Sequence, residues 1–123
     1  MHTAAQIRAE AHASALRVLR SLELPPGTAL AATGSFARNE MTPHSDIDVI
    51  LIYPEGYEPD PALVEQLWYP VWDAKYRLDY ALRTPQECGA IAAEDASAGF
   101  AQLDLAFVAG RKVLVDEARA QLL

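Results

Sequence analysis

The feature that most constrains this chain is a pair of aspartates, Asp46 and Asp48, at the start of the apolar run Val49–Tyr53. Such a run predicts a strand, whose side chains alternate between two faces, so both carboxylates would project from the same face. Two adjacent carboxylates repel each other unless a cation lies between them. Mg²⁺ suits this position, because it takes one or two carboxylates and completes its octahedron with water and substrate phosphates. The pair therefore predicts a magnesium site at the end of a strand.

A Gly–Ser pair precedes the aspartates along the chain. Gly34 and Ser35 follow a short run of small residues, and ten residues separate Ser35 from Asp46. Gly34 can adopt the backbone angles of a tight turn that a Cβ would obstruct. Residues 36–39 could then open a short helix, whose first N–H groups attract phosphate oxygens. The two motifs together predict a phosphate site beside the magnesium site.

A third acid lies on another predicted strand. Residues 76–83 alternate between two faces, and Asp79 shares one of them with Arg77 and Arg83. If this strand neighbours the first, Asp79 can meet the aspartate pair. It could instead pair with Arg77 or Arg83, and these arginines could bind a triphosphate or an acceptor. We favour the metal role for Asp79 and structural pairing for the arginines.

The remaining chain supplies helices and one further strand. We expect a helix within residues 1–22 with Thr3 as its N-cap, followed by a strand over 28–33. A second helix should start at Asp60–Pro61 and be kinked or split by Pro70, and a third should be capped by Thr84. We also expect a helix from about Asp95 to Ala109 that ends at Gly110, and a final helix over Val113–Leu123. This order predicts an α/β fold with a small sheet. It forms one domain over 1–123, with the catalytic sheet region at 28–83 and C-terminal helices at 85–123.

Composition narrows the class of protein. The 123 residues suit one domain. No apolar run approaches 20 residues and no signal peptide precedes the first helix, so we expect no membrane span. The lone cysteine, Cys88, excludes an internal disulfide and favours a cytoplasmic protein. A net charge of −7 argues against nonspecific nucleic-acid binding, which needs a basic face.

The spacing Gly34-Ser35, ten residues, Asp46-x-Asp48 resembles the nucleotidyltransferase superfamily that includes DNA polymerase β. The segments Leu67–Asp73 and Leu78–Pro85 are similar to the N-terminal catalytic domain of PII uridylyltransferases, and the resemblance covers roughly residues 28 to 110. Those enzymes usually carry Gly-Gly where this chain has Gly-Ser, and Arg-Gly-Glu where it has Arg-Asn-Glu. They are also far longer, with a hydrolytic domain and sensing domains.

The resemblance implies a small mixed sheet and a two-metal reaction on a nucleoside triphosphate. It implies that two Mg²⁺ ions are held by three carboxylates, Asp46, Asp48 and Asp79. Asp79 would also take the proton of the acceptor hydroxyl, and Ser35 would bind a β- or γ-phosphate oxygen beside Gly34. Arg38 would either touch phosphate or brace the turn.

The leading hypothesis is a Mg²⁺-dependent nucleotidyltransferase that transfers a nucleoside monophosphate from UTP or ATP to a protein hydroxyl and releases pyrophosphate. By resemblance, the acceptor would be a PII-type signal protein or another partner protein. One alternative acceptor is a small molecule such as an aminoglycoside. A third hypothesis is an antitoxin-type module that acts on or binds a helical partner toxin.

Overall fold

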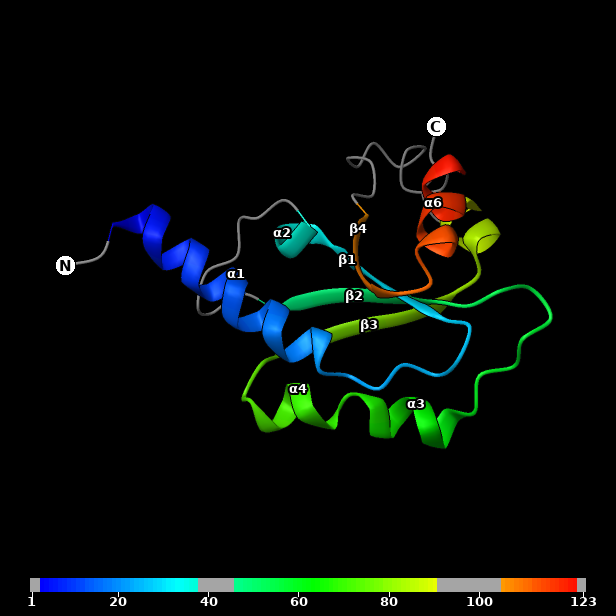
Figure 1. Ribbon diagram of the computed structural model, residues 1–123, viewed down its shortest axis with the longest axis horizontal. Coiled ribbons are helices and arrows are strands. Elements are labelled where there is room, and N and C mark those ends of the chain that lie inside the picture. Colours follow the sequence, from blue (N-terminus) through cyan, green and yellow to red (C-terminus); the bar gives the residue numbers. More distant parts are fainter. Residues whose placement is uncertain (1–2, 38–45, 91–104, 122–123) are drawn as a thin grey trace.

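The computed structural model describes residues 3–37, 46–90 and 105–121 (Figure 1). Its helices and strands are α1 (Ala4–Arg20), β1 (Ala29–Thr33), α2 (Gly34–Ala37), β2 (Ile47–Ile52), α3 (Pro61–Leu67), α4 (Tyr69–Asp73), β3 (Leu78–Arg83), β4 (Ala106–Gly110) and α6 (Lys112–Ala120). Residues 85–90 are also helical. None of the described helices is long and apolar enough to cross a membrane.

The four described strands form one mixed sheet in the order β3-β2-β1-β4. β1 pairs antiparallel with both β2 and β4, whereas β2 and β3 are parallel. A parallel pair needs a crossover connection, and α3 and α4 lie in this connection. The predicted α/β fold with a small mixed sheet is confirmed.

Helices cover both faces of the sheet (Figure 1). On one face, residues from α1, α3 and α4 pack with Val49 and Leu51 of β2. On the other face, α6 and Cys88 pack with Ile50 and Ile52. Because β2 is covered on both sides, five of its six residues are buried, and the partly exposed one is Asp48. The central strand therefore presents a single polar side chain near one end of an apolar layer.

Local sequence signals set the helix ends as expected. Thr3 caps α1 in a capping box with Gln6, and Asp60 accepts a hydrogen bond from the Ala62 N–H at the start of α3. Pro70 lies in the first turn of α4, where its missing N–H costs no helical bond, so the helix divides at Trp68.

The helix predicted from Asp95 to Ala109 is wrong over its last residues. Residues 95–104 lie outside the described residues, but Ala106–Gly110 form β4, which pairs with β1. Alanine favours helix, yet here the small side chains fit beside the alanine-rich strand β1 and Val108 is buried between layers. Gly110 ends the strand with a φ of 87°, and α6 then begins at Lys112. The segment 85–123 is thus not helical throughout.

Candidate active site

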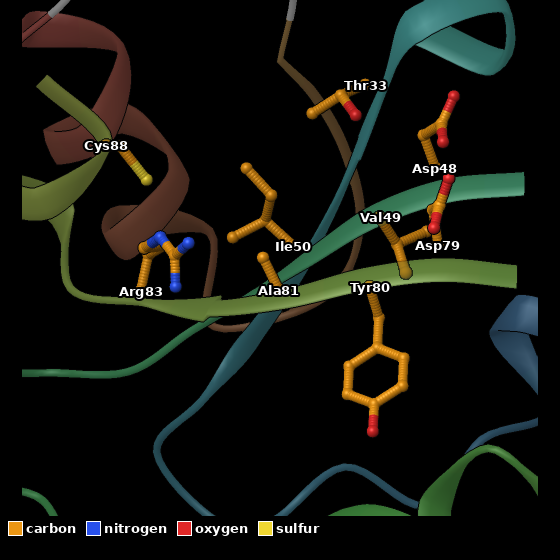
Figure 2. A pocket seen from close by; sticks show the side chains of 9 residues that line it. All are labelled: Thr33, Asp48, Val49, Ile50, Asp79, Tyr80, Ala81, Arg83 and Cys88. Carbon is orange, nitrogen blue, oxygen red and sulfur yellow. The ribbon is translucent and has the colours of Figure 1, made fainter. Parts of the chain in front are cut away.

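Two acidic side chains meet where β2 and β3 run in parallel. Asp48 of β2 is the register partner of Asp79 of β3, and both side chains extend from the same face of the sheet (Figure 2). Neighbouring strands lie about 4.8 Å apart, so partners in register are adjacent. Asp79 is exposed and Asp48 is partly exposed. The predicted meeting of these two acids is therefore seen in the structure.

The Gly–Ser turn lies against the same carboxylate. Thr33, the last residue of β1, is the register partner of Asp48, and α2 begins at the next residue, Gly34. Gly34 has a φ of 62°, and a Cβ on it would lie 2.6 Å from Asp48 Oδ2. Glycine is therefore required here both by the backbone angle and by the approach of the carboxylate.

The structure places Asp46 just outside β2. It is exposed, precedes the first residue of β2, and does not line the pocket described below. Across residues 3–37, 46–90 and 105–121, no three His, Cys, Asp or Glu side chains form a group that could hold a metal ion. The structure brings Asp48 and Asp79 together, and the role of Asp46 stays a prediction.

The phosphate-binding residues are described only in part. Ser35 belongs to the helical backbone of α2, directly after Gly34. Arg38 lies outside the described residues. The roles of Ser35 and Arg38 toward phosphate therefore stay predictions.

The two acids lie at one end of a pocket with a volume of about 320 Å³. Figure 2 shows its lining side chains, which are Thr33, Asp48, Val49, Ile50, Asp79, Tyr80, Ala81, Arg83 and Cys88. Ile50 and Ala81 lie between the acids and Arg83, and Tyr80 points away from the acids (Figure 2). The pocket thus combines an acidic end, an apolar floor and a basic end.

A capped helix start supports the basic end. The Thr84 hydroxyl accepts from the Glu87 N–H, and Glu87 Oε1 accepts from the Thr84 N–H at 3.0 Å, which confirms the predicted capping box. The hydrogen bond from the Thr84 backbone N–H is the main reason that the pKa of Glu87 is lowered. Glu87 also accepts a 3.3 Å hydrogen bond from the Tyr53 hydroxyl, whose pKa is raised mainly by burial.

Arg83, which the strand pattern placed on the face of Asp79, and Cys88 also line the pocket. Burial raises the pKa of the Cys88 thiol to about 11, so it is protonated at neutral pH and is a poor nucleophile. Arg83 Nη1 donates to the Leu82 carbonyl at 2.8 Å. The two-residue period of β3 thus placed Arg83 correctly on the face of Asp79, whereas no sequence pattern placed Cys88 in the pocket.

The donors at the acidic end fit magnesium. Asp48 and Asp79 offer carboxylate oxygens from adjacent strands, and hard cations prefer oxygen ligands. Because Gly34 has no Cβ, the Asp48 carboxylate can lie directly against the Gly–Ser turn. The chemistry of these two carboxylates therefore suits a divalent cation.

Comparisons with known proteins show which family this chain resembles. A model of the nucleotidyltransferase domain family matches residues 14–99. A bifunctional uridylyltransferase/uridylyl-removing enzyme of Corynebacterium glutamicum is 54% identical over 99% of this chain, which covers 17% of that enzyme. The enzyme of the same description from Streptomyces coelicolor is 36% identical over 79% of this chain and 12% of its own length. This chain therefore spans less than a fifth of the length of either relative.

Solved structures show the same fold. A toxin–antitoxin structure with AMP-PNP has a TM-score of 0.53, with 14% identity over 89% of this chain and 82% of that one. A candidate nucleotidyltransferase from Sulfolobus solfataricus has a TM-score of 0.50, with 17% identity over 91% of this chain and 92% of that one.

Proposed function

Since this chain belongs to the nucleotidyltransferase domain family, we propose that it transfers a nucleoside monophosphate from UTP or ATP to a protein hydroxyl, with Mg²⁺, and releases pyrophosphate. The observation that carries the proposal is the in-register pair Asp48 and Asp79 beside Gly34. Nucleotidyl transfer needs such a pair next to a turn that phosphate can approach.

The chain's own residues would divide the work of the reaction. Asp48 and Asp79, joined by Asp46, would hold Mg²⁺, which when bound stabilises charge on the attacking and leaving oxygens. Asp79 is exposed on the edge strand β3, where an acceptor can reach it, and would take the proton of the acceptor hydroxyl. The absent side chain at Gly34 leaves room for phosphate oxygens near the backbone of Ser35.

Support for UTP and for a protein acceptor comes from the relatives. Two uridylyltransferases share 54% and 36% identity with this chain. The chain spans less than a fifth of the length of these relatives. The proposed protein acceptor is inferred from the resemblance of this domain to PII uridylyltransferases. A small-molecule acceptor and a toxin partner are the other outcomes of the experiment below.

The proposal is tested by labelling. The purified chain, Mg²⁺ and α-³²P-labelled UTP or ATP are incubated with a lysate, and labelled products are separated by size. We expect a labelled protein, and a loss of about 100-fold or more for Asp48→Asn and Asp79→Asn, as expected for the removal of a charge-stabilising group. Asp73→Asn, an exposed acid at the end of α4, is the matched control and should label normally.

Two results would count against the proposal, and a third would identify the protein acceptor. A labelled small molecule would show that the acceptor is a small molecule and not a protein. A labelled toxin would identify the acceptor as a partner toxin. No label from either triphosphate would refute the transferase function.

A further inference from the structure

The pocket has a basic end as well as an acidic one. Asp79, Ala81 and Arg83 occupy alternate positions of β3 and so share one face of the sheet (Figure 2). At about 3.3 Å per residue, the Cα atoms of Asp79 and Arg83 lie about 13 Å apart. The apolar side chains of Ile50 and Ala81 lie between them. A ligand with phosphate at the acids would therefore extend over an apolar floor toward Arg83.

Arg83 has donors to offer such a ligand. Its side chain is partly buried, and one of its NH groups donates to the Leu82 carbonyl at 2.8 Å. The described part of the chain gives the guanidinium no other hydrogen bond, and no carboxylate there lies within ion-pair distance of it. A guanidinium has five N–H donors and no acceptor. The Arg83 guanidinium can thus bind hydrogen-bond acceptors of a ligand, whereas a hydrogen-bond donor of the ligand at this place would be unfavourable.

We propose that Arg83 selects the base of the bound nucleotide by donating a hydrogen bond to an exocyclic carbonyl, as found at O4 of uracil. The inference depends on the proposed function, because it assumes that a nucleoside triphosphate binds with its phosphates at the acids. Cytosine carries an amino donor where uracil carries O4, and adenine also carries an amino group on its edge. Arg83 would therefore favour UTP over CTP and ATP, with the flat base against the partly exposed Ala81.

The comparison of UTP with CTP tests this role, because the two differ at the position that Arg83 would read. Binding of each triphosphate to the purified chain with Mg²⁺ is measured by calorimetry, without an acceptor. A hydrogen bond to a charged group predicts that the wild-type chain binds UTP about tenfold or more tightly than CTP. In Arg83→Gln, whose amide can donate or accept, the ratio should fall to within about threefold, through a loss for UTP.

Controls separate base selection from folding and from charge. Arg20→Gln, on α1, should keep the wild-type ratio. Thermal unfolding checks each variant, and Arg83→Met, which keeps the aliphatic stem, replaces the Gln variant if that one unfolds.

Each outcome is decisive. Equal binding of UTP and CTP by the wild type, or an equal loss of both in the variant, would overturn base selection and leave the proposed transferase standing. Absence of triphosphate binding by the wild type would refute both. A ratio that is unchanged in a folded Arg83 variant would also overturn the inference.

Discussion

At the scale of single residues, the site depends on an atom that is absent. A Cβ on any other residue at position 34 would lie only 2.6 Å from Oδ2 of Asp48, too close for the present position of that carboxylate. The backbone angle at Gly34 adds a second cost, since its φ is 62°. Gly34 therefore permits both the backbone angle of the turn and the close approach of the Asp48 carboxylate.

We expect Gly34→Ala to lose both stability and activity. The left-handed backbone should cost about 1–2 kcal/mol of unfolding free energy, measured in urea. Displacement of Asp48 should lower kcat/KM at least about tenfold, which corresponds to about 1.4 kcal/mol.

Gly56→Ala is the matched control for this prediction. Gly56 has a φ of 84°, but a Cβ there would meet nothing within 4 Å. It should lose similar stability and keep its activity. Equal loss of activity in both variants would mean that the backbone strain, and not the contact with Asp48, explains the effect.

The aspartates show how far single positions could be predicted. The side-chain period of a strand placed Asp79 on the polar face of β3, and the parallel register then set it beside Asp48. The same rule does not apply to Asp46, because β2 begins at Ile47. A strand's alternation orients only residues inside the strand, so the sequence could not settle where the first acid lies.

At the scale of elements, the start of the helix at 85–90 carries a charge-dependent cap. The Glu87 pKa is lowered mainly by its bond from the Thr84 N–H, so the ionised form favours the folded state. Its contribution is present above the unfolded pKa, near 4.5, and disappears as pH falls through the lower folded pKa.

We therefore expect Glu87→Gln to be less stable than wild type at pH 7 and to approach it at low pH. Unfolding in urea at both pH values measures the difference. In a Thr84→Ala background most of this pH dependence should persist, because the backbone N–H of residue 84, the main cause of the lowered Glu87 pKa, remains. A Glu87→Gln effect that is equal at both pH values would contradict the assignment.

Trp68, at the division between α3 and α4, anchors these helices on the sheet. It is fully buried, and its ring centroid lies 4.9 Å from that of Tyr80. Trp68→Ala should cost about 3–5 kcal/mol of unfolding free energy.

Trp72→Ala should cost much less, because that side chain is 36% exposed and contacts Tyr69 at the surface. Urea unfolding of both variants makes the comparison. Similar losses would show that α4 depends on its outer aromatic contact as much as on the buried one.

Capping and proline signals made several helix starts predictable, and β4 shows the limit. Thr3, Asp60 and Thr84 each mark a helix start by hydrogen bonds to nearby backbone, which depend on local sequence alone. Ala106–Gly110 are extended because they pair with β1, a contact between residues far apart in the chain. Their alanines favour helix locally, so only the completed sheet reveals the strand.

At the scale of the whole molecule, Cys88 reports on unfolding. Its thiol is buried and has a pKa of about 11, so about one molecule in a thousand carries a thiolate at pH 8. We expect a thiol reagent to label the native chain slowly and the urea-unfolded chain quickly. Rapid labelling in native buffer would show that the layer holding α6 and Cys88 opens without global unfolding.

The crossover between β2 and β3 determines when the site forms during folding. Residues 53–77 separate the two strands, so Asp48 and Asp79 become neighbours only when this stretch has folded back on the sheet. Contacts between distant residues form late, because the chain entropy of the loop is lost first. During refolding, the magnesium affinity proposed for this pair should consequently return with the last phase of sheet assembly, and fragments that end before residue 78 should have none.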